Sequence, residues 1–225
     1  MKKIAISLLI LVMLSAVPGS PGNIFSHVPK TIDTHARYLI YLHGRIIETS
    51  GRRPTHPRFG VYEYDRILQT FADSGFVVIS EARPADTRAL EYARKVVAQI
   101  DTLLRQGVAP SRITVVGASK GAAIAGFVSA LLKNPQVRFV LLAICNKRMV
   151  NVWVNQAGPF YGKVLYIYER SDRIGRSCQP FLSQLKSDGL TAFKEIELNT
   201  GLQHGFLYRP LPEWVNPTVE WAKHP

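Results

Sequence analysis

The sequence has 225 residues, 47% of them hydrophobic, which is enough for one domain with a sizeable core. Lys and Arg outnumber Asp and Glu by 28 to 16, and the net charge of +12 indicates anionic surroundings: a membrane, a wall polymer or an anionic substrate. An ordinary solvated basic surface is the alternative. The sequence contains no nucleic-acid-binding motif, so nucleic acid is not an expected partner.

The first 22 residues have the pattern of a secretory signal. Met1–Lys3 carries two lysines, Ile4–Leu14 is an apolar segment, and small residues and prolines continue to Gly22. The eleven residues of the apolar segment are too few to span a bilayer. We therefore expect residues 1–22 to direct export to the periplasm or the medium, and residues 23–225 to form a single domain. An uncleaved membrane anchor is the alternative, because no clear small-residue cleavage site is present.

From residue 36 onward, short apolar runs typical of strands alternate with longer segments whose apolar residues recur at helical spacing. Strands are predicted from Ala36 into His43 and over residues 76–84, 113–116, 137–145, 163–170 and 193–199. Helices are predicted over residues 62–74, from an Asp86 N-cap to Gly107, from Ala122 onward, and over residues 178–188 and 214–223. This alternation predicts an α/β fold in which a parallel sheet has helices on both faces. The connection over residues 146–162 is too short for a lid domain.

The pentapeptide Gly117-Ala118-Ser119-Lys120-Gly121 stands between a predicted strand and a predicted helix. A G-x-S-x-G motif in that setting is typical of a nucleophile elbow, whose tight turn lifts the serine hydroxyl clear of the backbone. Glycine is expected at Gly117 and Gly121, because side chains there would collide with the neighbouring strand and helix. A chance motif is the alternative, and the strand-to-helix setting disfavours it. Ser119 is therefore the predicted nucleophile.

A serine hydroxyl needs a base, and the base needs an acid to orient it. After such an elbow the chain order is Ser, then acid, then His, each on a loop that follows a later strand. Asp172 follows the strand that ends at residue 170, and His204 follows the strand that ends at residue 199. Glu169 is the competing acid, but it belongs to the strand itself. Asp172 and His204 are therefore predicted to complete a triad with Ser119.

Acyl transfer also needs backbone N–H donors for the negative oxygen of the tetrahedral intermediate. One donor is predicted to be the N–H of Lys120, the residue after the nucleophile. The other is expected from the loop after the first long strand, most simply the N–H of Arg45. His43 and Gly44 come directly before it and are interpreted as residues that shape this loop, rather than as a second general base.

Together, His43-Gly44-Arg45, the elbow of residues 117–121, Asp172 and His204 make the chain resemble the α/β-hydrolase superfamily. It is most similar to the small, cap-free esterase- and dienelactone-hydrolase-like members. The resemblance implies an α/β-hydrolase fold without a lid, and hydrolysis of a carboxylic ester, or of a related acyl bond, through an acyl-enzyme without a cofactor. The chain departs from the family in lacking the HGGG oxyanion motif and the leading antiparallel strands of larger members. It also has Ser where dienelactone hydrolases typically have Cys.

The substrate and the reaction class leave alternatives open. Arg52, Arg53, Arg173 and Arg176 fall on loops expected at the carboxyl ends of the strands, so they are candidate substrate-binding residues for an anionic ester. A catalytically silent binding protein on the same scaffold is one alternative. A small serine peptidase or amidase is another.

The two cysteines are expected at neighbouring positions. Cys145 ends one predicted strand, and Cys178 lies just past the end of the next, so adjacent parallel strands would bring them together. An exported protein meets oxidising conditions, which favours a disulfide over two free thiols. The sequence has neither the paired Cys and His spacing of a zinc site nor the spacing of a phosphate-binding loop, so no metal is predicted.

Overall fold

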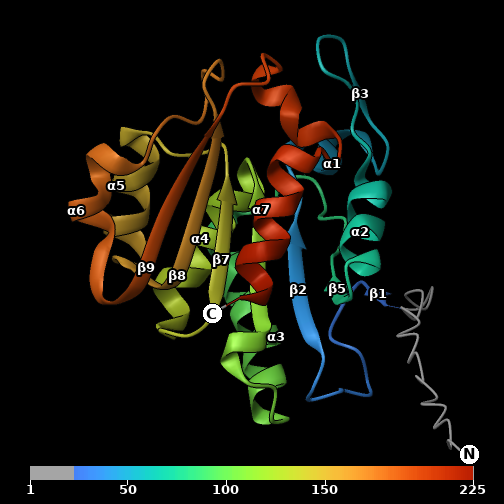
Figure 1. Ribbon diagram of the computed structural model, residues 1–225, viewed down its shortest axis with the longest axis vertical. Coiled ribbons are helices and arrows are strands. Elements are labelled where there is room, and N and C mark those ends of the chain that lie inside the picture. The colour runs from blue at the N-terminus through green and yellow to red at the C-terminus, as the bar shows by residue number, and fades with distance from the viewer. Residues whose placement is uncertain (1–22, 225) are drawn as a thin grey trace, which may run out of the picture.

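The computed structural model describes residues 23–224, and a parallel sheet runs through the middle of them (Figure 1). Seven strands lie in the order β1-β5-β2-β6-β7-β8-β9, and every neighbouring pair is parallel. In chain order the strands are β1 (Ile24–Phe25), β2 (Arg37–Leu42), β5 (Phe76–Ile79), β6 (Ile113–Ala118), β7 (Arg138–Leu142), β8 (Phe160–Glu169) and β9 (Lys186–Leu198). Because all the strands run the same way, their carboxyl ends meet at one edge of the sheet.

The strand order reverses beside β2, since the chain moves outward from β2 to β5 and then returns to the other side of β2 as β6. The loops after β2 and β6 therefore diverge at their carboxyl ends. In open sheets of this kind ligands bind in the crevice at such a reversal. The separate antiparallel hairpin of β3 (Thr55–His56) and β4 (Gly60–Val61) projects beside this edge (Figure 1).

Helices cover both faces of the sheet, as expected from the sequence. On one face lie α3 (Ala89–Arg105), α4 (Lys120–Leu132), α5 (Lys147–Gln156) and the short α6 (Leu182–Leu185). On the other lie α1 (Arg45–Ser50), α2 (Tyr64–Asp73) and α7 (Pro212–Lys223). The described residues also form three short 3-10 helices: η1 (Pro110–Arg112), η2 (Gln179–Phe181) and η3 (Gln203–Tyr208).

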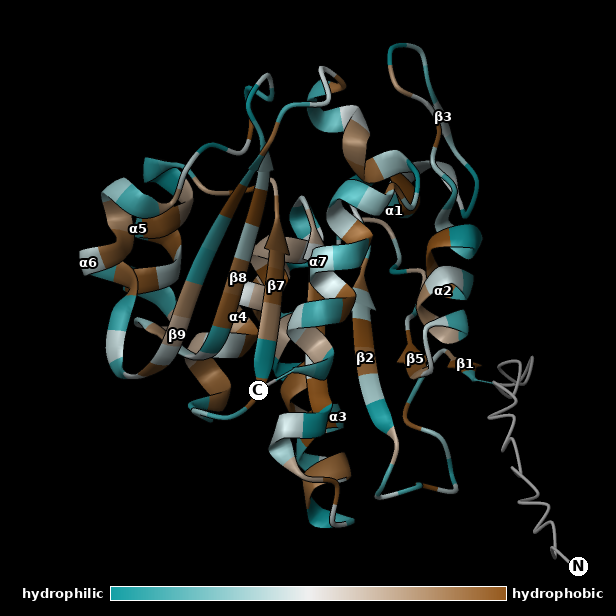
Figure 2. Ribbon diagram, viewed as in Figure 1, coloured by the Kyte–Doolittle hydropathy of each residue, from teal (hydrophilic) through white to brown (hydrophobic). Residues whose placement is uncertain are grey.

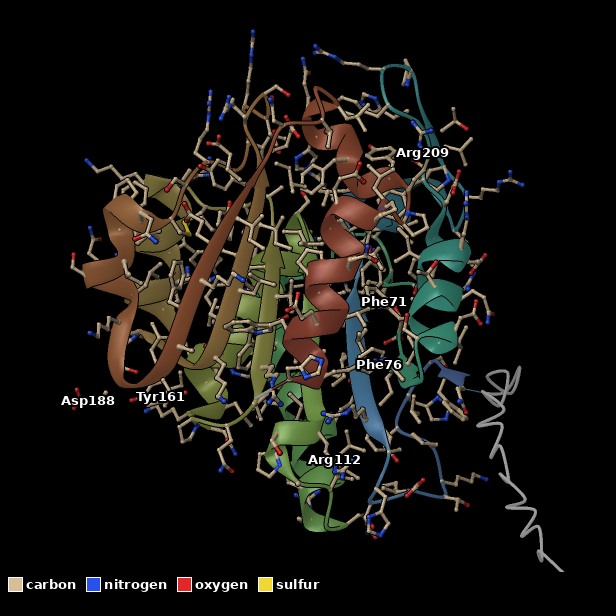
Figure 3. All side chains as sticks on the ribbon, viewed as in Figure 1. Phe71, Phe76, Arg112, Tyr161, Asp188 and Arg209 are labelled. Carbon is tan, nitrogen blue, oxygen red and sulfur yellow. A yellow bond between two sulfur atoms is a disulfide. The ribbon has the colours of Figure 1, made fainter. Side chains whose placement is uncertain are left out.

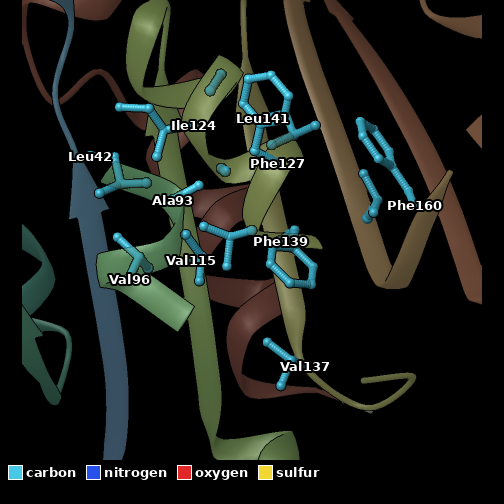
Figure 4. Close-up of a cluster of buried hydrophobic side chains, with 14 of the residues drawn as sticks. Leu42, Ala93, Val96, Val115, Ile124, Phe127, Val137, Phe139, Leu141 and Phe160 are labelled. Atoms are coloured by element: carbon cyan, nitrogen blue, oxygen red, sulfur yellow. The ribbon is translucent and has the colours of Figure 1, made fainter. Parts of the chain in front are cut away.

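Two hydrophobic cores result, one on each face. Along β2, Ile40 and Leu42 join the core under α3 and α4, whereas Leu39 and Tyr41 join the core under α2 and α7. Figure 4 shows part of the first core. Every residue of β6 and β7 is buried, and β7 is brown, the colour of hydrophobic residues, along most of its length in Figure 2. Burial on both faces explains why these strands are continuous apolar runs.

Some predicted element bounds were wrong. The expected helix over residues 178–188 is reduced to η2 and the single turn of α6, and β9 begins at Lys186 rather than at residue 193. The missed part of β9 lies along the edge of the sheet, paired only with β8, so most of its residues are partly exposed and polar. An edge strand of this composition lacks the apolar run that marks a buried strand.

Two loop residues have backbone conformations that the sequence pattern did not indicate. Asp86 has a φ of +59° and does not cap α3, which starts at Ala89 with Arg88 in the N-cap position. Ala143 has a φ of +56°, so β7 stops at Leu142 instead of continuing to residue 145. The left-handed region is incompatible with both a strand and a standard N-cap.

The predicted signal segment, residues 1–22, lies outside the described residues. Among residues 23–224, no helix has both the length and the apolar character needed to cross a membrane.

Cys145 and Cys178 are joined by a disulfide, with their Cα atoms 5.5 Å apart. It links the segments that follow β7 and β8 and closes a loop with a sequence separation of 33. In the chain-entropy model a loop of this size stabilises the folded state by about 3–4 kcal/mol. We therefore expect the reduced protein to have a free energy of unfolding lower by about that amount, measured by urea denaturation with and without reductant. Two alkylatable thiols in the purified, unreduced protein would contradict the pairing.

Candidate active site

Ser119 stands on the sharp turn between β6 and α4, with a φ of +52° and a ψ of −115°. Its N–H donates a 2.9 Å hydrogen bond to the carbonyl oxygen of Leu142 at the end of the neighbouring β7. A Cβ at Gly117 would lie 2.3 Å from the carbonyl oxygen of Gly121, and a Cβ at Gly121 would lie 1.8 Å from that of Leu42. Both glycines are therefore sterically required, and the strained serine conformation is held by its surroundings.

The structure brings Ser119, His204 and Asp172 into one hydrogen-bonded row. His204 Nε2 lies 2.9 Å from Ser119 Oγ, and His204 Nδ1 lies 2.6 Å from Asp172 Oδ2. The second carboxylate oxygen of Asp172 accepts the N–H of Ile174 at 2.9 Å. Because a carboxylate only accepts, the proton of the neutral imidazole belongs on Nδ1, which leaves Nε2 free to accept the serine proton. The geometry thus suits a nucleophile, a base and an orienting acid.

The acid and the base of the row are nearly closed to solvent. The side chain of Asp172 is 2% exposed and that of His204 is 12% exposed. Asp172 and His204 come from the loops after β8 and β9, and Ser119 comes from the loop after β6. The common direction of the strands brings the three together across 85 residues of sequence.

The two predicted oxyanion donors are the first residues of two helices. Arg45 begins α1, although we expected it in a loop, and Lys120 begins α4. The N–H of a first helical residue has no acceptor within its own helix. Within residues 23–224, neither N–H donates a hydrogen bond. Arg45 borders the same cavity as Ser119, and Lys120 follows Ser119 directly in the chain.

The Lys120 side chain does not enter that cavity. Its ammonium pairs with Glu48, a buried residue of α1 that also accepts a 2.9 Å hydrogen bond from Arg83 Nε. Glu48 thereby ties the start of α4 to α1. This ion pair fixes the relative positions of the two helices whose first N–H groups are the candidate donors.

His43 is fully buried, and its ring makes two backbone hydrogen bonds. Nε2 accepts the N–H of Arg83 at 2.8 Å, so Nδ1 is the nitrogen that donates to the carbonyl oxygen of Gly44, also at 2.8 Å. Burial, and secondarily the positive charge of Arg83, lower the pKa of His43 to about 3. A ring with such a low pKa stays neutral and holds the loop in place, which agrees with a shaping role.

Gly44 is not sterically required, in contrast to the elbow glycines. Its φ is −69°, and the nearest atom to an added Cβ would be Tyr62 Cε2 at an ordinary 3.7 Å. Its N–H lies 3.4 Å from the phenol oxygen of Tyr62, which also exchanges a 2.9 Å hydrogen bond with Tyr41. Gly44 therefore contributes through its backbone, whose carbonyl oxygen and N–H bond to His43 and Tyr62, and not through the absence of a side chain.

A cavity of about 200 Å³ opens beside Ser119 and His204. Besides these two, it is lined by Gly44, Arg45, Ile46, Tyr62, Ile174, Leu207 and Tyr208. Most of the lining side chains are apolar or aromatic, which suits an acyl chain better than a charged group. The volume lies below the usual range of roughly 300–1,000 Å³ for ligand pockets.

The sequence did not identify most of these lining residues. Ile46 comes from α1, Tyr62 and Ile174 come from two loops, and none of the three belongs to a motif. Leu207 and Tyr208 had a usable signal, because the apolar stretch GFLY follows His204 directly and forms most of η3. Side chains adjacent to a predicted base are expected to border its site.

The four arginines proposed as substrate-binding residues do not line the cavity. Arg52 pairs with Asp65 and lies over the ring of Tyr64, 4.9 Å from its centroid, and Arg53 borders a separate hollow beside α2. Arg173 and Arg176, which come before and after Ile174 in the sequence, are both exposed. Figure 3 shows many nitrogen-tipped side chains projecting from this end of the molecule, with Arg209 labelled among them. Of the arginines near this site, Arg45 therefore borders the cavity, whereas the four proposed substrate-binding arginines do not.

Within the described part of the chain, no group of three or more His, Cys, Asp or Glu side chains is placed to hold a metal ion.

No protein-family model matches the chain, and no curated protein matches its sequence. Solved structures match its fold. SOBER1 from Arabidopsis thaliana has a TM-score of 0.54 and 16% identity, over 84% of this chain and 98% of that one. Est1E from Butyrivibrio proteoclasticus has a TM-score of 0.53 and 13% identity, over 85% and 89%. A hyperthermophilic esterase from the archaeon Pyrobaculum calidifontis has a TM-score of 0.53 and 20% identity, over 85% and 75%.

At these identities the likeness establishes the fold alone. The chain has an α/β-hydrolase fold, as its sequence led us to expect, with a parallel central sheet and helices on both faces.

The low pKa of His43 predicts a dependence of stability on pH. The unfolded chain takes up a proton at this ring below about pH 6.5, whereas the folded protein resists protonation until the pH approaches 3. The free energy of unfolding should therefore fall as the pH falls below 6.5, by up to about 1.4 kcal/mol per pH unit from this group. Urea denaturation at several pH values measures this slope.

His43→Gln keeps an acceptor for the Arg83 N–H but cannot titrate, so its slope should be shallower. His35→Gln changes an exposed histidine and serves as the matched control, with the slope of the unaltered protein. Equal slopes in all three proteins would contradict the buried, neutral state of His43.

Proposed function

We propose that the protein is an exported serine hydrolase that cleaves a carboxylic ester through an acyl-enzyme. The observation that supports this most strongly is the row formed by Ser119, His204 and Asp172, with hydrogen bonds of 2.9 and 2.6 Å. Several proteins of similar fold are named as esterases, which agrees with ester hydrolysis. The signal-like pattern of residues 1–22 supports export.

In the first half of the reaction, Ser119 Oγ attacks the acyl carbon while its proton passes to His204 Nε2. The Asp172 carboxylate, bonded to Nδ1, stabilises the imidazolium that forms. The carbonyl oxygen becomes negative and accepts hydrogen bonds from the N–H groups of Arg45 and Lys120. When the tetrahedral intermediate collapses, His204 gives its proton to the leaving alkoxide, and the alcohol departs.

In the second half, water takes the place of the alcohol. His204 Nε2 accepts a proton from the water as its oxygen attacks the acyl carbon of the ester bond to Ser119. The second tetrahedral intermediate then expels Ser119 Oγ, which recovers its proton from His204. These steps use only side chains and backbone groups of the chain, and they need no cofactor.

The cavity favours a small acyl group. Its volume of about 200 Å³ and its apolar lining of Ile46, Ile174 and Leu207 accommodate a short aliphatic chain, whereas a long chain would extend past the rim. Arg52, Arg53, Arg173 and Arg176 do not line this space, so they can act on a charged end of a substrate or on an anionic surface only outside it. There Arg173 and Arg176 would attract anionic molecules before they enter.

Variants of the row test the proposed chemistry. Ser119→Ala should lower kcat for nitrophenyl butyrate by several orders of magnitude, because it removes the nucleophile. His204→Ala should be comparably severe, and Asp172→Asn somewhat less so, because the acid orients and stabilises rather than reacts. Full activity of Ser119→Ala would contradict the assignment. Absence of turnover with every ester and amide tested would favour a binding protein on this scaffold.

The exposed arginines predict an effect of substrate charge. The kcat/KM for a succinyl ester should exceed that for a butyryl ester of similar size at low salt, because exposed arginines raise the association rate of anions. Added salt should reduce the difference, since it screens exposed charges. The double variant Arg173→Gln, Arg176→Gln should lose the preference while keeping its butyryl activity. Equal efficiencies at low salt, unchanged by added salt, would leave these arginines without a role.

A further inference from the structure

Glu169, the last residue of β8, is a buried carboxylate that the proposed reaction does not use. It has no exposed surface, and within residues 23–224 it forms no ion pair with Lys, Arg or His. Burying a charge costs free energy unless hydrogen bonds replace the lost water. The hydrogen-bond donors around the Glu169 carboxylate therefore indicate its role.

The donors come from two loops. On one side, Oε1 accepts the Ser171 hydroxyl at 3.0 Å and the Ser171 N–H at 3.3 Å. On the other, Oε2 accepts the Thr200 hydroxyl at 2.7 Å and the Thr200 N–H at 2.8 Å. The Gly201 N–H approaches Oε1 at 3.4 Å. Each carboxylate oxygen is thus bonded mainly to one loop.

These two loops carry the acid and the base. Ser171 directly precedes Asp172, whose own N–H donates to the Glu169 carbonyl oxygen at 3.0 Å. Thr200 stands four positions before His204 in the sequence. The Ser171 hydroxyl, which donates to Glu169, also accepts the N–H of Gln203 at 3.2 Å, next to His204. A continuous hydrogen-bonded path therefore joins both loops through one carboxylate.

The ionised form is the one that these contacts favour. Burial alone would raise the pKa of Glu169, but the hydrogen bonds from Thr200 and Ser171 outweigh it and hold the pKa below its ordinary value. Hydrogen bonds to a charged acceptor are roughly twice as strong as bonds between neutral groups. A carboxylate is therefore a stronger link between the two loops than a neutral side chain of the same shape.

We propose that Glu169 is a positioning residue, whose carboxylate clamps the Asp172 loop to the His204 loop and so sets the distance between acid and base. This inference rests on the proposed function, in which that distance governs proton transfer from Ser119. The clamp acts through its neighbours and does not touch the reacting atoms.

Glu169→Gln tests the clamp with little change of shape. An amide has one acceptor oxygen and one NH₂ group, so whichever way it turns, the donors of one loop face another donor. We expect kcat to fall by about 10- to 100-fold, because small misplacements of catalytic groups have effects of this size, with KM within about twofold. Glu197→Gln, at the neighbouring end of β9, removes a carboxylate that pairs with Arg170, and it should leave kcat unchanged.

A spectroscopic readout separates positioning from general destabilisation. The proton between His204 Nδ1 and Asp172 should give a downfield ¹H NMR signal in the unaltered protein and in Glu197→Gln. In Glu169→Gln, measured well below its unfolding midpoint, that signal should weaken or disappear. The readout needs no substrate, so it tests the clamp even if no ester is hydrolysed. Unchanged kcat together with an unchanged signal in folded Glu169→Gln would overturn the proposal.

If Glu169→Gln does not fold, Thr200 supplies a milder test. Thr200→Val removes the hydroxyl that donates to Oε2 but keeps the backbone donor, whereas Thr200→Ser keeps both. We expect Thr200→Val to lower kcat and weaken the His204 signal, and Thr200→Ser to restore both. Identical behaviour of Thr200→Val and Thr200→Ser would overturn the proposal.

Discussion

The close approach of α4 to the end of β2 is the contact on which the rest of the site depends. A Cβ at Gly121 would lie 1.8 Å from the carbonyl oxygen of Leu42, so any other residue would push the helix away from the strand. Since α4 starts directly against the end of β2, Lys120 at its first position lies close enough to α1 to pair with Glu48. Ser119 precedes Lys120 directly, with a φ of +52° that its neighbours hold in place. The reversal of strand order beside β2 provides a crevice at the carboxyl ends of the strands. Gly121 allows α4 to pack directly against the end of β2 at this crevice.

Two buried glutamates then hold the two sides of the site. Glu48 accepts from Arg83 and Lys120 and ties α1 to α4 on the side of the candidate oxyanion donors. Glu169 accepts from Ser171 and Thr200 and ties the two loops on the side of the acid and the base. Buried carboxylates are costly unless every oxygen is bonded, and both of these are. Rigid elements thus carry the nucleophile, while hydrogen-bonded carboxylates fix the loops around it.

The sequence was sufficient for the α/β fold and for the residues of the row, because each of these has a local signal. Ser119 stands in a five-residue motif with steric requirements, and Asp172 and His204 follow recognisable strands. The lining residues Ile46, Tyr62 and Ile174 and the roles of the two glutamates could not be predicted, since they arise from contacts between distant segments. Glu169 was interpreted as a competing acid, and only its five donors from two loops give it a different role. The four arginines proposed as substrate-binding residues lie outside the cavity lining, because their positions depend on loop conformations that the sequence pattern does not encode.

The central claim is that Ser119 is an activated nucleophile, and covalent trapping tests it most directly. The purified protein would be incubated with a fluorophosphonate, digested, and analysed by mass spectrometry to locate the adduct. We expect a single phosphonylated site at Ser119, together with loss of labelling in His204→Ala, because the reagent needs the hydroxyl activated by the imidazole. An unlabelled protein, or an adduct on a different residue, would show that Ser119 is not an activated nucleophile.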